Sequence, residues 1–229
     1  MKKSHLATLL VFFLLIPLTL LLGKHLPGRK YYITTTLIIL ELMLPFFLSF
    51  EGRKPQAREL VILAVLCALA IAGRVVFPIP HFKAVFAIII IAAIAFGPEA
   101  GFMVGAITAF ASNFFYGQGP FTPWQMFAYG AGGMLAGFLF RKGWLPRKPW
   151  VMAVFGFCAV LFFIGPILDS SSIFIMLSRI TWKAIVTVYT SGLFINFCQA
   201  LCTAAVLLLV GKPLLDKLER VKVKYGMHG

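Results

Sequence analysis

The chain is dominated by long apolar runs, which leave little sequence for anything except membrane-spanning helices. We identify eight such runs: residues 6–22, 31–50, 60–77, 82–96, 100–115, 124–140, 150–168 and 182–210. A helix needs about 20 apolar residues to cross a bilayer, so eight spans account for roughly 160 positions. The apolar residues do not alternate with polar ones, which disfavours a membrane β-barrel. The sequence therefore predicts an all-α polytopic membrane protein with about eight spans.

The composition supports this class. Of the 229 residues, 61% are hydrophobic and only 12% are charged, whereas a soluble domain carries about 25% charged residues. This argues against a soluble enzyme and against a secreted disulfide scaffold. The four cysteines lie inside apolar runs and form no CxxC motif. We expect them to be small buried side chains and predict no metal site.

The basic residues predict the orientation. Lysine and arginine total 21 against 7 acidic residues. In a soluble chain this excess would indicate nucleic acid, but here the basic residues lie between apolar runs, so the positive-inside rule explains them. The basic residues are concentrated at 53–58, 141–148 and 212–224. With an even number of spans, these three segments and both termini all lie on the cytoplasmic side. The loop at 24–30 does not follow the positive-inside rule, because its basic residues fall on the outer side. We expect a multi-pass protein of a bacterial-type cell membrane with no nucleic-acid partner.

A polar join at residues 51–55 separates two parts of the chain. We expect an N-terminal transmembrane hairpin over 1–55. A six-helix substrate-binding membrane core with a basic cytoplasmic tail is expected over 56–229. Lys2 and Lys3 before the first apolar run also fit a signal peptide, but no small-x-small cleavage site follows, so we expect a retained anchor. No internal repeat stands out, which weakens an inverted-repeat transporter hypothesis.

Small residues recur at four-residue intervals in three places. The sets are Ala64, Ala68 and Ala72; Gly97, Gly101, Gly105 and Ala109; and Gly133 and Gly137. Four residues make about one helical turn, so each set forms a smooth stripe that lets another helix approach closely in lipid. We expect the glycine stripes to pack within the chain and the alanine stripe to dock a separate membrane subunit.

The densest polar stretch covers residues 112–125 and joins two apolar runs on the outer side. Within it, Thr122, Pro123 and Gln125 fit a helix start with a capping box. The same helix N-terminus could instead hold a polar ligand group. The stretch interleaves amide side chains with aromatic rings, as small-molecule sites do, although an interfacial aromatic belt would look similar.

These features give a set of candidate binding residues. The stretch and the following helix supply Asn113, Phe114, Tyr116, Gln118, Phe121, Trp124, Gln125 and Tyr129; the neighbouring outer loop supplies His81, Phe82 and Lys83; and the last span supplies Asn196. Lys83 either snorkels to the interface or faces an anionic ligand group. Asn196 and Gln199 either form interhelical hydrogen bonds or reach the ligand.

Glu41 and Arg74 are ionisable side chains inside apolar runs, where charge is costly. Glu41 is either locally paired or coupled to protons, and Arg74 lies near an outer end, where it can snorkel. The sequence contains no HExxH, GxSxG or Walker lysine motif. We therefore predict no catalytic residues and no cofactor. Active transport would need energy from another chain.

Residues 96–105 (FGPEAGFMVG) and 112–127 (SNFFYGQGPFTPWQMF) resemble the substrate-binding S components of energy-coupling factor (ECF) vitamin transporters. The resemblance covers about residues 56–211, and its most specific part is GQGPFTPWQ. It implies a six-helix membrane protein that captures a vitamin at its outer face. It also implies docking, through Ala64, Ala68 and Ala72, on a transmembrane coupling subunit that rests on two ATP-binding subunits.

The resemblance leaves the ligand and the N-terminal hairpin open. The aromatic Thr-Pro-Trp-Gln variant loosely resembles the branch linked to cobalamin or its precursors, and riboflavin or another heterocycle would also stack on the rings. The core of the family that the sequence resembles has six helices, so residues 1–55 are an addition to that core. Two other hypotheses stay open: a stand-alone proton-coupled secondary transporter that uses Glu41, and a membrane assembly protein without a ligand.

Overall fold

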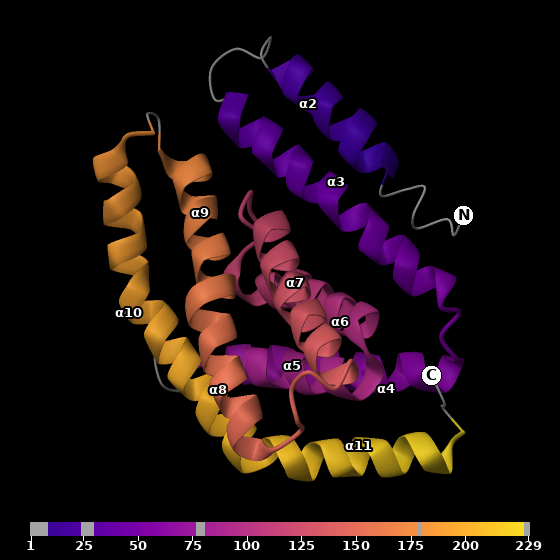
Figure 1. The fold of residues 1–229 in the computed structure, drawn as a ribbon. Coiled ribbons are helices and arrows are strands. Elements are labelled where there is room, and N and C mark those ends of the chain that lie inside the picture. The colour runs from indigo at the N-terminus through magenta and orange to yellow at the C-terminus, as the bar shows by residue number, and fades with distance from the viewer. Residues whose placement is uncertain (1–8, 24–29, 77–80, 178–179, 227–229) are drawn as a thin grey trace.

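The computed structural model describes residues 9–23, 30–76, 81–177 and 180–226, and these residues form helices joined by short turns. The elements are η1 (Val11–Leu15), α2 (Ile16–Gly23), α3 (Lys30–Gly52), α4 (Ala57–Val75), α5 (Val85–Phe96), α6 (Pro98–Tyr116), α7 (Thr122–Arg141), α8 (Pro149–Ala159), η2 (Val160–Ile164), α9 (Gly165–Met176), α10 (Trp182–Val206), η3 (Leu207–Gly211) and α11 (Lys212–Lys224). No strand occurs in the described residues, so the all-α prediction is confirmed (Figure 1).

Each predicted apolar run coincides with a helix. Among the described residues, three helices are long and apolar enough, by length and composition, to cross a membrane: Tyr32–Gly52, Pro149–Met176 and Trp182–Lys224. Shorter apolar helices cover Phe13–Gly23 and Val85–Phe96. The protein is therefore an all-α polytopic membrane protein.

The helix that covers the apolar run at 150–168 is longer than that run, because α9 continues to Met176. Asp169, Ser170 and Ser171 have hydrogen-bond partners within α9 or on the neighbouring helix α10. The hydroxyls of Ser170 and Ser171 donate to carbonyl oxygens of the preceding turn, at 2.7 and 2.6 Å. Asp169 accepts a 2.7 Å hydrogen bond from Asn196 of α10. These contacts offset the cost of polar groups inside a helix pair.

Helix α5 lies at the centre of the core, and all of its residues are buried. A helix that is apolar all round has no face that prefers water, so it becomes the element that the others surround. Helices α4, α6 and α7 pack against it. Its two ends therefore set the positions of the polar groups at the two ends of the core.

The glycine stripes pack against one another, as predicted. A Cβ on Gly101 would lie 2.8 Å from the carbonyl oxygen of Gly133, and a Cβ on Gly105 would collide with the backbone of Tyr129. Only glycine allows helices α6 and α7 to cross this closely. This contact fixes where the outer ends of the two helices meet.

The N-terminal hairpin lies along one side of the core, where α3 runs past α6, α7 and α9 (Figure 1). Ile39 and Met43 of α3 are buried in a cluster with Phe102, Ala106 and Trp124. Within the hairpin, Thr19 of α2 donates a hydrogen bond to Glu41 of α3. Of the loop at 24–30 that disagreed with the positive-inside rule, residues 24–29 lie outside the described residues, and Lys30 begins α3.

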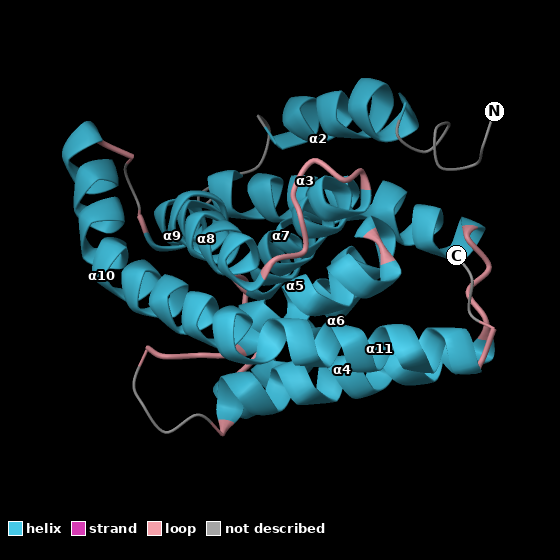
Figure 2. Cartoon of the chain, turned by 60° about the horizontal axis from the view of Figure 1, so that its bottom comes forward, coloured by secondary structure: helices cyan, strands magenta, loops and turns pink. Residues whose placement is uncertain are grey.

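The basic tail forms α11, which runs alongside α4 (Figure 2). Its inner face buries Leu215 and Leu218 against the core. Beyond its end, the Tyr225 ring lies 5.5 Å from the guanidinium carbon of Arg58, near the start of α4. The tail is thus part of the folded core.

Candidate ligand-binding site

A hydrogen-bond network at the outer end of the core is centred on Arg74, in the last turn of α4. Its guanidinium donates to Ser112, to Oδ1 of Asn113 at 2.9 Å and to Oε1 of Gln125 at 3.4 Å. These acceptors come from α6 and α7, so one side chain connects three helices. We call Arg74, Ser112, Asn113, Thr122 and Gln125 the Arg74 network.

Asn113 is fully buried and supplies the second centre of this network. Its Nδ2 donates to Oε1 of Gln125 at 2.8 Å and to the hydroxyl of Thr122 at 3.1 Å. Both ends of the amide are therefore used, and the turn between α6 and α7 is tied to the end of α4. Removing such a buried partner leaves the others unsatisfied, which costs about 1–3 kcal/mol.

Two tyrosine rings flank the guanidinium of Arg74. Its central carbon lies 5.1 Å from the ring centroid of Tyr116 and 5.4 Å from that of Tyr129. The hydroxyl of Tyr116 donates to the carbonyl oxygen of Arg74 at 2.8 Å. Among the described residues, no carboxylate forms an ion pair with Arg74. Amide oxygens and ring faces therefore stabilise its charge.

A cavity of about 210 Å³ adjoins the Arg74 network; we call it the outer cavity. Its lining residues are Arg74, Lys83, Val85, Tyr116, Gln125, Tyr129, Leu168 and Gln199. They come from six helices, α4, α5, α6, α7, α9 and α10, and from the residues just before α5. The lining combines cations, phenol rings and amides with two aliphatic side chains, which suits a heterocycle that carries carbonyl groups.

The alanine stripe lies outside this cavity, on the free face of α4. Ala64, Ala68 and Ala72 are exposed, whereas the opposite face of the helix is buried by Leu63, Leu66, Cys67 and Ala70. The stripe therefore makes no contribution to packing within the chain. It remains open to lipid or to another subunit.

The family model described as "ECF-type riboflavin transporter, S component" matches residues 54–219. The chain belongs to this family. The resemblance inferred from the sequence is thus confirmed, and the protein is a vitamin-binding subunit of an ECF transporter in the plasma membrane. No curated protein and no solved structure matches the chain. The match begins at residue 54, so the N-terminal hairpin lies outside it.

The S component brings four of the twelve predicted binding residues to the outer cavity: Lys83, Tyr116, Gln125 and Tyr129. Asn113 does not line the cavity but holds Gln125 in place. Phe82 is half-buried next to Lys83. The loop residues 77–80 that precede His81 lie outside the described residues.

Four other predicted residues lie apart from the outer cavity. The side chain of Phe114 is 69% exposed. Gln118 donates to the carbonyl oxygen of Phe110 at 2.9 Å. Phe121 packs over Gly119, and the ring of His81, itself exposed, lies 6.4 Å from that of Phe194. These side chains shape the outer surface of the S component.

Trp124 and Asn196 do not line the outer cavity and instead contact neighbouring helices. Trp124 stacks on Phe174 of α9 at 5.6 Å and faces the N-terminal hairpin. Asn196 bonds to Asp169 and fills the space beside Gly165, where a Cβ would lie within 2.8 Å of its Oδ1. Both side chains hold helices together.

The predicted capping box at the start of α7 is wrong. The N-cap position falls on Phe121, and no side chain caps it. The hydroxyl of Thr122 instead accepts from the amide of Gly119 at 3.2 Å, and Oε1 of Gln125 accepts from Arg74 and Asn113. A guanidinium held away from water needs acceptors, so it takes the Gln125 oxygen. Pro123 does lie in the first turn, as expected.

Sequence reasoning missed Arg74 as a site residue and left Gln199 undecided. Arg74 was assigned to the interface because it lies near the end of an apolar run. The sequence did contain a sign of this role, because no other Lys, Arg, Asp or Glu residue lies between Glu59 and Lys83. An isolated charge in a span is a candidate for function, and its partners became visible only when α4, α6 and α7 were placed together.

Proposed function

We propose that the outer cavity of this S component binds riboflavin or a closely related flavin-sized heterocycle. The observation that carries the proposal is the convergence of Arg74, Lys83, Gln125 and Gln199 on one cavity next to two tyrosine rings. The matching family model is described as a riboflavin transporter S component. Together these favour a flat ligand with polar edges.

The chemistry of the lining fits such a ligand. The ring of Tyr129 or Tyr116 offers a face for stacking against an aromatic heterocycle. The amides of Gln125 and Gln199 offer both donors and acceptors, which match neighbouring N–H and carbonyl groups on a ring. The cations at Arg74 and Lys83 attract the carbonyl oxygens, where ring electron density is highest.

The volume of the outer cavity disfavours the cobalamin hypothesis. Pockets that enclose drug-sized ligands measure about 300–1,000 Å³, and the outer cavity measures about 210 Å³. Part of a tricyclic ring fits in such a space, whereas a corrin macrocycle would require the helices to separate. We therefore favour a flavin over cobalamin or its precursors.

We further propose that the alanine stripe docks this S component on a transmembrane coupling subunit. In lipid, helices associate through close packing of small residues and not through burial of apolar area. The exposed stripe of Ala64, Ala68 and Ala72 offers such a surface. Two ATP-binding subunits on the coupling subunit would then supply the energy. In this scheme residues 56–229 form the capture core, and residues 1–55 are an added hairpin.

The experiment that tests the ligand is equilibrium binding by the detergent-purified full chain, followed by flavin fluorescence for riboflavin and by calorimetry for cobalamin, thiamine and folate. We expect riboflavin to bind saturably and more tightly than the others. Gln199→Ala should weaken riboflavin binding about tenfold, which corresponds to one lost hydrogen bond. A matched control is Gln56→Ala, which removes an exposed amide at the opposite end of α4.

Tighter binding of cobalamin than of riboflavin would contradict the ligand assignment. Equal losses in Gln199→Ala and Gln56→Ala would contradict the site. Saturable riboflavin binding that depends on Gln199 alone would support both.

A further inference from the structure

A second polar cavity lies at the opposite, cytoplasmic end of the core, where α5 ends. It measures about 140 Å³, and its lining residues are Arg53, Glu59, Ile94, Ala95, Phe96, Arg141, Arg147 and Lys222. We call it the cytoplasmic pocket. Its lining brings four cations from four separate parts of the chain together with one carboxylate, although such cations repel one another unless something compensates them.

Part of this positive charge has a partner within the chain. Arg53 forms an ion pair with Glu59 and donates to the carbonyl oxygen of Phe96 at 2.7 Å. Lys222 donates to the carbonyl oxygen of Ala95 at 2.7 Å. These two cations satisfy the free carbonyl groups at the C-terminus of α5. Arg147 pairs with Glu219 at the surface.

Arg141 provides charge that the chain does not compensate. Its guanidinium fills the space beside Gly97, next to the end of α5. No carboxylate forms an ion pair with Arg141 in the part of the chain that the structure describes. The side chain is exposed at the mouth of the pocket. It is therefore available to an anion from outside the chain.

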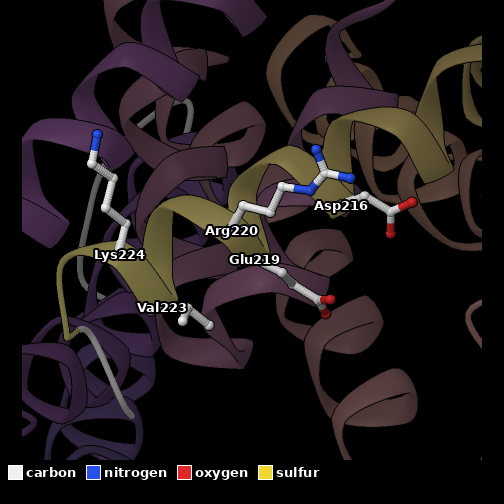
Figure 3. Close-up of a pocket in the computed structure, with 5 residues that line it drawn as sticks. All are labelled: Asp216, Glu219, Arg220, Val223 and Lys224. Carbon is white, nitrogen blue, oxygen red and sulfur yellow. The ribbon is translucent and has the colours of Figure 1, made fainter.

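The outward face of α11 does not share this excess. Figure 3 shows Asp216, Glu219, Arg220, Val223 and Lys224 around a separate, shallow hollow on this single helix. Its two cations equal its two carboxylates in number, although Glu219 already pairs with Arg147 and Asp216 with Lys212. Lys222 lies on the inner side of the same helix and reaches α5.

A large apolar cavity begins at the same turn of the chain. It measures about 580 Å³, and its lining residues are Phe46, Ser49, Pro98, Glu99, Phe127, Ala131, Met134, Leu135, Phe138 and Phe163. Phe96 lines the cytoplasmic pocket, and Pro98 and Glu99 line the apolar cavity. Arg53 lies 3.9 Å from Glu99. Cationic and apolar surfaces therefore adjoin at the cytoplasmic end of the core.

We propose that the cytoplasmic pocket binds the phosphate group of an anionic phospholipid from the cytoplasmic leaflet, and that an acyl chain of this lipid lies in the apolar cavity. Basic pockets between helices on the cytoplasmic side are suited to lipid head groups, and the arginine fork matches phosphate oxygens. A free phosphate shares the head-group chemistry but makes no use of the apolar cavity, which is why the lipid is favoured.

The test is native mass spectrometry of the full chain released from detergent after titration with phosphatidylglycerol or phosphatidylcholine. We expect phosphatidylglycerol to bind more tightly. Arg141→Gln should weaken its binding about fivefold, the value of one cation near an anionic surface. Arg147→Gln is a second variant in case the first is poorly folded. Arg220→Gln is the matched control, since it removes the same charge from the outward face of α11.

A separate arm titrates inorganic phosphate and glycerol phosphate against the thermal unfolding temperature of the same proteins. Stabilisation by either compound at submillimolar concentration, lost in Arg141→Gln, with no preference between the two lipids, would assign the pocket to a soluble phosphate and overturn the lipid proposal. Equal lipid binding by Arg141→Gln, Arg147→Gln and Arg220→Gln would overturn the site itself. Preferential phosphatidylglycerol binding that is reduced only by the two pocket variants would support it.

Discussion

Arg74 and Asn113 are 39 residues apart in the sequence, yet Nη1 of Arg74 donates a 2.9 Å hydrogen bond to Oδ1 of Asn113. This bond joins the outer end of α4 to that of α6. Asn113 in turn donates a hydrogen bond to Gln125 of α7. The side chains that line the outer cavity are thus held by a buried network. This arrangement leads to the first prediction.

Arg74→Lys should disrupt the site although it preserves the charge. A lysine ammonium cannot donate in the fork geometry that reaches Ser112, Asn113 and Gln125 together. We expect a loss of about 1–3 kcal/mol of stability and at least about tenfold weaker ligand binding. Thermal unfolding and ligand titration measure both effects. Arg220→Lys, at an exposed position, is the control, and an Arg74→Lys protein with unchanged ligand affinity would argue against the network.

Gly105→Ala should separate α6 from α7. The added methyl group would collide with the backbone of Tyr129 and Gly130, which cannot move independently of the helix. We expect a loss of about 1–3 kcal/mol, together with weaker ligand binding because Tyr129 lines the outer cavity. Gly52→Ala has nothing within 4 Å of the new Cβ and should change neither property. A stable Gly105→Ala protein in the same unfolding assay would contradict the close crossing.

Trp124→Phe should affect stability and not ligand binding. The indole stacks on Phe174, and its Nε1 has no hydrogen-bond partner in the part of the chain that the structure describes. We expect a loss of about 1–3 kcal/mol from the smaller ring, with a dissociation constant within about twofold of the original because the side chain lies apart from the cavity. A large loss of ligand affinity in a folded variant would instead indicate that Trp124 is part of the binding site.

Glu41→Gln should preserve transport. Glu41 accepts from Thr19 within the hairpin, and its second oxygen is buried without a partner among the described residues. A neutral amide keeps the acceptor and lowers the cost of burying charge, so stability should be equal or higher. Uptake by proteoliposomes that contain the complete ECF module should be unchanged. Uptake by this chain alone, abolished in Glu41→Gln, would support a proton-coupled transporter and exclude the capture function.

Ala68→Trp should prevent docking on the coupling subunit. The large ring would cover the middle of the exposed alanine stripe on α4, and helices could no longer approach closely there. We expect co-purification with the coupling subunit to be lost, while ligand affinity is retained. Ala205→Trp introduces the same ring at an exposed alanine of α10 and should leave docking intact. Loss of docking in both variants would mean that the stripe has no special role.

The continuous apolar runs alone predicted the helices, and the reason is that a bilayer allows few other structures. A backbone that enters lipid must satisfy its own hydrogen bonds, so continuous apolar runs become helices whatever their neighbours. The runs at 60–77 and 82–96 matched α4 and α5 closely for this reason. The glycine spacing likewise predicted close packing within the chain, and the structure shows that the two helices involved are α6 and α7.

The outer cavity, in contrast, was decided by tertiary structure. Trp124 and Asn196 looked like binding residues because rings and amides suit ligands, but the same groups also suit buried contacts between helices, and the sequence does not state which face they occupy. Arg74 looked like an interfacial charge until α6 and α7 supplied its acceptors. Local spacing fixes a side chain's direction on its own helix, whereas the cavity depends on how six helices meet, and packing between distant segments determines that.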